Sequence, residues 1–164
     1  MALALLLLSG CTLPFTKGLQ QQLDDSGVKV ENVQFYNSGR VLLERDLSKE
    51  EASVSDGKIV LRAGQHVEQV VIRPLTPGLC LRRSPDKDRL YVAFEAGQHR
   101  ALVFKHDFDW FYLSPDTAHS VLYDGKKYRL RKTITGSRPH LRVRKSEFFK
   151  LIKERRVVPG LRVN

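Results

Sequence analysis

Residues 121–130 read VLYDGKKYRL, two short apolar runs that meet at Asp124 and Gly125. Both residues of an Asp-Gly pair can adopt a positive φ angle, as the tight two-residue turn of a β-hairpin requires. This stretch therefore predicts a hairpin, and similar patterns recur toward both ends of the chain.

Short apolar runs separated by turn residues continue through most of the sequence. They predict three further strand pairs, formed by residues 28–36 with 40–44, 58–62 with 67–72, and 89–94 with 101–104. Strands at such regular spacing are typical of a sandwich or a barrel. Near the C-terminus, residues 141–144 alternate as a strand, and residues 146–156 predict a helix because Phe148, Leu151 and Ile152 share one helix face. We therefore expect a mainly β fold, a small sandwich or partly open barrel of hairpins with one short C-terminal helix.

Length and composition limit the class of protein. The chain has 164 residues, which suits one domain of ordinary size. Hydrophobic residues make up 41% and charged residues 28% of it, so the chain is neither a disordered tail nor a polytopic membrane protein. Cys11 and Cys80 alone cannot supply a disulfide-stapled miniprotein or a four-thiolate metal site.

The N-terminus carries an uncharged, leucine-rich run over residues 1–10, followed by Cys11. The run is shorter than the roughly 20 apolar residues of a spanning helix and suits the hydrophobic region of an export signal. Residues 8–11, Leu-Ser-Gly-Cys, resemble the lipidation box of bacterial lipoproteins, although the run lacks the Lys or Arg with which such signals normally begin. The resemblance implies a signal peptide over 1–10, cleaved before Cys11, and a lipid anchor of acyl chains such as palmitate on Cys11.

The residues after Cys11 bear on localisation and on domain boundaries. In lipoproteins of this kind an Asp after the cysteine holds the protein at the inner membrane, so Thr12 favours the outer membrane, on its periplasmic or surface side. Residues 11–27 are polar and show no sustained period, so we expect the lipidated cysteine and a flexible tether there. The mainly β domain is then expected over residues 28–164.

Positive charge is concentrated at the C-terminal end. The whole chain has a formal charge of +10, yet residues 126–164 hold 14 Lys and Arg against two acids, Glu147 and Glu154. So few acids over this length make self-repulsion costly, and an anionic partner is the usual compensation. Seven cations around the predicted helix are the expected contact residues: Arg142, Arg144, Lys145, Lys150, Lys153, Arg155 and Arg156.

The compartment narrows the choice of anion. Nucleic acid is the standard partner of a basic patch, but an exported protein seldom meets it. Phospholipid headgroups, lipopolysaccharide, peptidoglycan and an acidic protein are the expected partners of a lipid-anchored protein. The alternative is an internal charge match, in which acids such as Glu44, Asp46, Glu50 and Glu51 pair with the basic segment.

No catalytic residue, metal ligand or cofactor is expected. The stretch from His106 to Trp110 is the most site-like, because it joins an imidazole, two carboxylates and a large aromatic ring. A hydrolase with paired carboxylates is one interpretation, but such a stretch is more often a loop whose aromatics anchor the core. The five histidines lack the spacing of zinc ligands. Cys80, flanked by Leu79 and Leu81, is expected to be buried.

Three functions follow from these features. The first is a non-catalytic envelope lipoprotein whose β domain binds an anionic envelope component or a partner protein through its basic C-terminal surface. The second is an accessory lipoprotein subunit of a secretion or conjugation machine. The third is a lipid-anchored hydrolase that uses residues 106–110.

Overall fold

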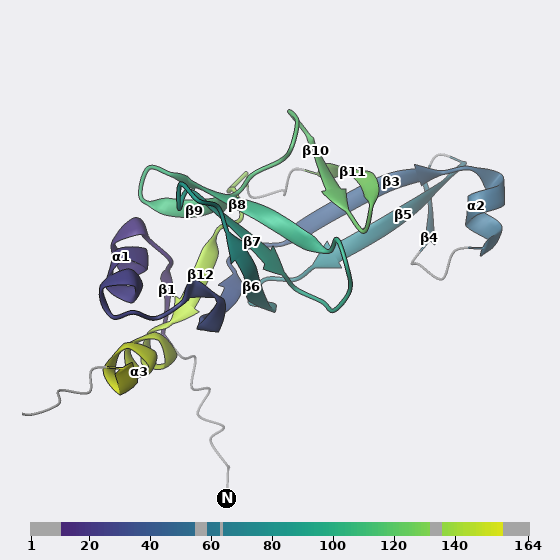
Figure 1. Cartoon of the computed structure of the whole chain (residues 1–164). Helices are drawn as coiled ribbons and strands as arrows, with labels where there is room; N and C mark the ends of the chain where they lie inside the picture. Colours follow the sequence, from purple (N-terminus) through teal and green to yellow (C-terminus); the bar gives the residue numbers. More distant parts are fainter. Residues whose placement is uncertain (1–10, 55–58, 63, 132–135, 156–164) are drawn as a thin grey trace, which may run out of the picture.

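Two antiparallel β-sheets carry the fold in the computed structural model, which describes residues 11–54, 59–62, 64–131 and 136–155 (Figure 1). In spatial order, the strands of the seven-stranded sheet are β1 (Thr12–Pro14), β12 (Leu141–Arg144), β2 (Gln34–Asn37), β6 (Pro77–Arg83), β7 (Arg89–Ala93), β8 (Ala101–Asp107) and β9 (Trp110–Leu113). Those of the five-stranded sheet are β10 (Ser120–Tyr123), β11 (Lys126–Arg131), β3 (Val41–Leu47), β5 (Gln65–Ile72) and β4 (Ile59–Arg62). The predicted mainly β class is confirmed.

The seven-stranded sheet curls until its two ends approach each other. Isolated bridges join Thr16, just after β1, to Trp110 in β9, and Tyr112 in β9 to His140, just before β12. These bridges do not form a continuous ladder, so the sheet is not closed into a barrel.

The helices are α1 (Lys17–Asp25), α2 (Lys49–Val54) and α3 (Lys145–Arg155), with a 3-10 turn η1 (Val30–Asn32). The C-terminal helix α3 was predicted, but the expectation of a single helix is wrong. Thr16 caps α1, because its Oγ1 accepts a hydrogen bond from the Leu19 N–H at 3.1 Å. Ser48 and Glu51 form a reciprocal capping box at the start of α2, with hydrogen bonds of 3.0 and 3.1 Å.

The expectation of a flexible tether over residues 11–27 is also wrong. Phe15 is fully buried, and its ring centroid lies 4.9 Å from that of Phe35 in β2 and 5.4 Å from that of Phe111 in β9. Leu23 of α1 is fully buried as well. The folded domain therefore begins at Thr12, and not at Val28.

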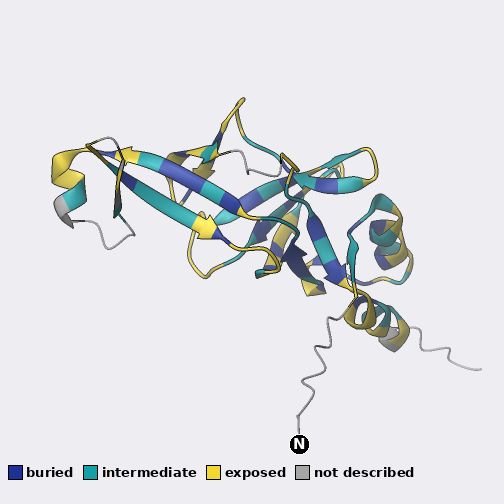
Figure 2. Ribbon diagram, turned by 180° about the vertical axis from the view of Figure 1, so that it is seen from behind, coloured by how far each residue is buried: buried dark blue, intermediate teal, exposed yellow. Residues whose placement is uncertain are grey.

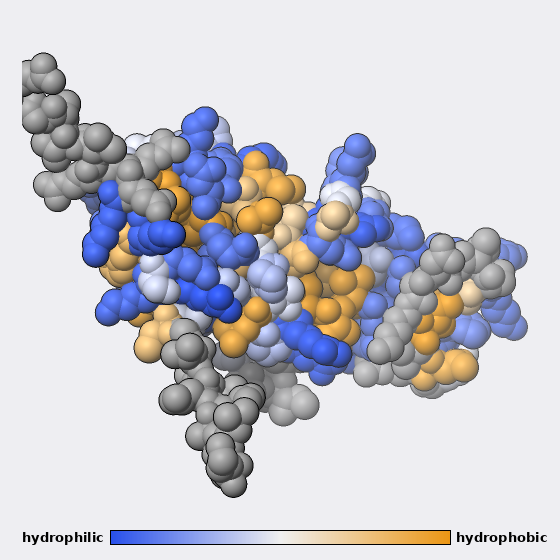
Figure 3. Space-filling model, turned by 90° about the horizontal axis from the view of Figure 1, so that it is seen from below, coloured by the Kyte–Doolittle hydropathy of each residue, from blue (hydrophilic) through white to orange (hydrophobic). Residues whose placement is uncertain are grey.

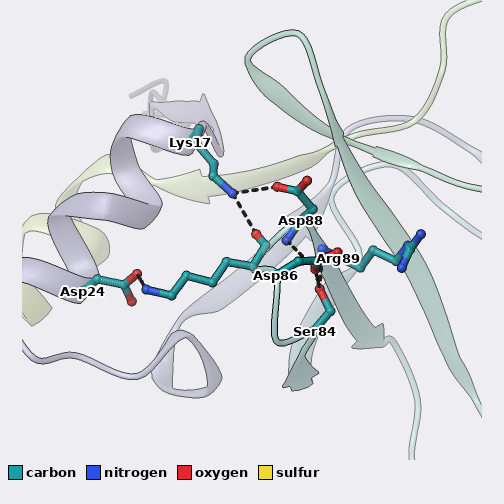
Figure 4. A network of polar contacts seen from close by, with 7 residues as sticks. Lys17, Asp24, Ser84, Asp86, Asp88 and Arg89 are labelled. Carbon is teal, nitrogen blue, oxygen red and sulfur yellow. Dashed lines mark hydrogen bonds and ion pairs between the residues drawn. The ribbon is translucent and has the colours of Figure 1, made fainter.

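Ion pairs connect α1 to the end of β6 and to the turn between β6 and β7 (Figure 4). Lys17 Nζ lies 2.9 Å from Asp88 Oδ1 and donates to the Lys87 carbonyl at 2.9 Å. Asp24 accepts from Arg83 at 2.8 Å and from Lys87 at 2.9 Å. Partial burial favours the neutral Asp24 carboxyl, but these two cations outweigh it and lower the pKa of Asp24. Each pair alone is weak because it is partly solvated, so α1 is held by the pairs together with Leu23.

Most of the predicted hairpins are present. In the β10–β11 hairpin Val121 pairs with Tyr128, and both turn residues have the expected positive φ, 52° at Asp124 and 71° at Gly125. The pairs β4–β5 and β7–β8 are antiparallel as predicted. The predicted pairing of 28–36 with 40–44 is wrong, because β2 pairs with β12 and β6, while β3 belongs to the other sheet.

The core lies where the two sheets meet. Val41, Leu43 and Ile72 from the five-stranded sheet pack with Leu90 and Phe104 from the seven-stranded sheet. From there β3 and β5 project away from the body as a long ribbon, with α2 at its far end (Figure 2). The projecting end lies far from α1 and α3, which cover the opposite end of the molecule (Figure 1).

Candidate functional site

Cys11 lies at the start of α3, although the two are far apart in the sequence. Its carbonyl oxygen accepts a hydrogen bond from the backbone N–H of Lys145 at 3.0 Å. The next residue, Thr12, pairs with Arg144 in the ladder between β1 and β12. Cys11 itself is exposed. The candidate lipid attachment residue and the first residues of the basic helix therefore form one surface.

The exposed side of α3 carries most of the predicted cations in that part of the chain. Lys145, Lys150 and Lys153 are exposed, whereas Phe148 is buried and packs against Phe15. Lys145 and Lys153 enter no ion pair within the described part of the chain. This α3 face, defined here as Arg144, Lys145, Lys150 and Lys153, carries four cations around Glu147. The side chain of Glu154, the other acid of α3, lies outside what the structure describes.

Arg142 and Arg144 make contacts within the protein. Arg142 is half-buried, and its guanidinium donates to the hydroxyl and the carbonyl oxygens of Thr12 at 2.9 and 2.7 Å. These contacts hold β1 in place. Arg144 stays exposed, lies 4.8 Å from the centroid of the Tyr36 ring and pairs with Glu147 at 3.1 Å. Burial and the nearby Glu147 carboxylate raise the pKa of Tyr36.

Two of the seven predicted contact residues cannot be placed in this surface. Arg155 is the last residue of α3, and its side chain lies outside what the structure describes. Arg156 lies outside the described residues altogether.

The other basic element is strand β11, and its two arginines form ion pairs with acids of β3. Arg131 Nε lies 3.0 Å from Glu44 Oε2, and Arg129 lies 2.7 Å from Asp46 Oδ1. The Glu44 carboxylate is only 2% exposed and also accepts from Gln69 Nε2 at 2.7 Å. The internal charge match thus holds for Arg129 and Arg131, whereas Glu51 pairs with Arg45. Lys126 and Lys127 of β11 stay exposed, so what distinguishes the α3 face is its contact with Cys11.

The stretch from His106 to Trp110 forms the β8–β9 hairpin, and several of its polar and aromatic groups contact other parts of the fold. The Asp107 carboxylate pairs with Arg138 at 2.5 Å, and the Asp109 backbone carbonyl accepts from the Lys17 N–H at 3.2 Å. The Trp110 ring packs on His140, with centroids 4.5 Å apart. Burial lowers the pKa of His140. This packing seals the place where the curled sheet nearly closes.

Phe108, at the tip of the β8–β9 hairpin, is the main surprise in this stretch. It is 94% exposed and has a φ of 55°. It is the first residue of a two-residue turn, a position at which a positive φ normally calls for Gly. The expectation that Phe108 anchors the core is wrong.

Exposed leucines form a second feature that the sequence interpretation missed. Strand β6 buries Gly78 and Cys80 on one side and exposes Leu79 and Leu81 on the other, to 52% and 56%. The leucines on either side of Cys80 predict that Cys80 is buried. Cys80 is indeed 3% exposed, but the strand alternation that buries it turns both leucines outward.

Two shallow hollows connect these leucines to α3. One, of about 390 Å³, is lined by Leu79, Leu81 and Phe94, and the other, of about 220 Å³, is lined by Phe148 and Leu151 of α3. Gln34 lines both hollows, and it also pairs with Leu79 in the ladder between β2 and β6. The leucines of β6 are therefore neighbours of the side of α3 that carries Glu147 and Leu151.

In the part of the chain that the structure describes, no three His, Cys, Asp or Glu side chains are grouped as metal ligands would be. None of the helices in that part of the chain is long and apolar enough to cross a bilayer.

Set against known proteins, the chain matches no family model, and no curated protein or solved structure matches it.

Proposed function

We propose that this protein is a non-catalytic lipoprotein of the bacterial cell envelope, anchored through Cys11 and sorted to the outer membrane. Its β domain binds an anionic envelope component or a partner protein through the α3 face. The observation that carries the proposal is the contact between the Cys11 carbonyl and the Lys145 N–H at 3.0 Å, which joins the candidate anchor to the basic helix.

The division of charge between the two basic elements supports this assignment. The arginines of β11 are paired with Glu44 and Asp46, so they mainly stabilise the fold. The α3 face keeps exposed lysines next to Cys11. Acyl chains on Cys11 would hold these lysines at an envelope surface whose headgroups and polymers are anionic.

The anchor is tested by expressing the full chain in a bacterial host and extracting it from membranes with detergent. Mass spectrometry should find a chain that begins at Cys11 and carries acyl mass on that residue. The Cys11→Ser variant should stay unprocessed. An unmodified mature Cys11 would overturn the proposed anchor.

The anionic partner is tested with isolated envelope fragments. Replacing Lys145, Lys150 and Lys153 by Ser should weaken binding and its salt dependence, because exposed charges are screened over roughly 10 Å at 0.1 M salt. The control replaces Lys126 and Lys127, which are also exposed but lie on β11. Equal loss in both variants would contradict a role of α3.

Phe108 supports one alternative, an accessory subunit of an envelope secretion or conjugation machine. Phe108 is exposed, and its positive φ costs conformational energy. Because its ring does not stabilise the fold, the position favours a contact with another protein. A photo-crosslinking residue at position 108 should then capture a single envelope subunit in living cells. Crosslinking to many unrelated proteins would count against this alternative.

A further inference from the structure

We propose that the α3 face and the exposed leucines of β6 lie directly on the headgroups of the membrane that holds Cys11. The partner of this surface is the anionic phospholipid headgroup layer around the anchor. The inference rests on the proposed lipidation of Cys11 and assigns the partner that the proposed function leaves open.

The first step is that no flexible linker separates Cys11 from the folded domain. Thr12 follows Cys11 directly and pairs with Arg144, and the Phe15 N–H donates to the Leu141 carbonyl at 2.9 Å. The Phe15 side chain is then buried in the core. A domain on a long tether has no preferred face toward the membrane. A domain joined at its first strand must place the surface around Cys11 at the depth of the headgroups.

The second step is the charge of that surface. Arg144 and Lys145 adjoin Cys11, and Lys150 and Lys153 continue along α3. All four are exposed, while Phe148 on the other side of the helix is buried in the core. Basic residues held near an anionic leaflet are attracted to it within about one Debye length, roughly 8 Å at physiological salt.

The third step is the apolar surface next to the side of α3 that carries Glu147 and Leu151. Leu79 and Leu81 are more than half exposed, and Gln34 connects their hollow to that of α3. Seen from below, the side on which α3 lies, hydrophobic patches stand among hydrophilic side chains (Figure 3). A surface that combines basic side chains with exposed leucines suits the boundary between headgroups and acyl chains. Acyl chains on Cys11 would already keep the bilayer next to this surface. Lipid therefore fits the surface better than a separate protein.

The test uses the acylated full chain, reconstituted into vesicles and labelled with a lysine reagent that cannot cross membranes. In vesicles of equal parts phosphatidylcholine and phosphatidylglycerol, labelling of Lys145, Lys150 and Lys153 should fall several-fold relative to detergent. Lys126 and Lys127 on β11 are the internal control and should label equally in both. The protection should be lost in phosphatidylcholine alone and in about 1 M salt, where screening acts over roughly 3 Å.

A second measurement tests the leucines. Leu81→Cys and Leu122→Cys place a thiol at similarly exposed positions, 56% on β6 and 59% on β10. A polarity-sensitive dye on position 81 should shift to the blue in the mixed vesicles and be quenched by lipid-borne nitroxides. The dye on position 122 should do neither. Cys80 should not react, since burial and the nearby Glu31 raise the pKa of its thiol to about 11.

The outcomes separate the inference from the proposed function. Acyl mass on Cys11 together with equal labelling of α3 and β11 overturns the membrane-facing surface and leaves the anchor intact. A Cys11 without acyl mass overturns the anchor. The labelling is then carried out on the unacylated chain added to the same vesicles, where unprotected α3 lysines overturn the membrane-facing surface as well.

Discussion

The rings of Phe15 and Phe148 lie 6.4 Å apart at an interplanar angle of 65°. Phe15 directly follows β1, and Phe148 lies in the first turn of α3, so this contact joins the two ends of the described chain. Both side chains are buried, at 0% and 2% exposure. The N-terminal segment and α3 consequently behave as one unit with the sheets.

Phe15→Ala tests this unit directly. The substitution removes a fully buried ring that contacts Phe35, Phe111 and Phe148, so the free energy of unfolding should fall by about 3–5 kcal/mol. Urea unfolding followed by circular dichroism measures the loss. Gln21→Ala, at an exposed position of α1, is the control and should change the stability by less than about 0.5 kcal/mol. A loss below about 1 kcal/mol for Phe15→Ala would instead support the flexible tether.

The parts of the fold that could be predicted are those that local sequence encodes. The β10–β11 hairpin follows from Asp124 and Gly125, whose backbone angles are what that pair allows. Helix α3 follows from the spacing of Phe148, Leu151 and Ile152. The helix caps are local as well: Thr16 is the N-cap of α1, but the glutamines between Leu19 and Leu23 hide the apolar spacing of that helix.

The parts that could not be predicted depend on pairing between distant segments. Residues 37–39 look like a hairpin turn, yet the Asn37 carbonyl accepts from the Leu75 N–H, and β2 turns toward β6. Phe15 is a single aromatic residue in a polar stretch. The rings that it contacts lie far away in the sequence, so the local pattern does not predict these contacts. The same holds for the candidate site, since the contact between Cys11 and Lys145 exists only once β1 has paired with β12.

Phe108→Asn should leave the fold intact and should not lower its stability. Asn tolerates a positive φ better than most other residues that carry a side chain. The Phe108 ring is 94% exposed and has a φ of 55° in the structure. We expect the free energy of unfolding to stay unchanged or to rise by up to about 1 kcal/mol. Phe104→Ala, a fully buried position on the same hairpin, is the comparison and should cost about 3–5 kcal/mol. Clear destabilisation by Phe108→Asn would mean that the exposed ring has a partner within the fold.

Alkaline pH should destabilise the protein because several buried acids hold their protons tightly. Burial, aided by the nearby Glu31, raises the pKa of Cys80 from 9.0 to about 11. Burial and a hydrogen bond to Glu68 raise the pKa of Tyr128 to about 12, and burial with a hydrogen bond to Glu95 raises that of Tyr123. In each case the folded pKa exceeds the unfolded one, so the stabilisation is complete below the unfolded pKa and is lost as the pH rises toward the folded pKa.

Urea unfolding across the alkaline range measures this effect. Between about pH 9 and pH 11, Cys80 alone should lower the free energy of unfolding by on the order of 2 kcal/mol. Cys80→Ala should be less stable at neutral pH, because of the space it leaves, but should lose stability less steeply above about pH 9. A parallel pH dependence in the two proteins would show that the Cys80 thiol does not contribute.

The two ion pairs between β3 and β11 should differ in strength, although both join an Arg to an acid of the neighbouring strand. Glu44 is 2% exposed and accepts from both Arg131 and Gln69, so Glu44→Ala removes a buried carboxylate and its two hydrogen bonds from partly exposed donors. Its cost should be about 1–3 kcal/mol. Asp46 and Arg129 are about half exposed, and Asp46→Ala should cost less than about 1 kcal/mol. Urea unfolding at low and at high salt measures both, and only the Asp46 variant should approach the parent protein as salt screens the surface pair. Equal costs would mean that β11 is held by side-chain packing instead of by the buried carboxylate, and the charge of β11 would then be available to a partner just as that of α3 is.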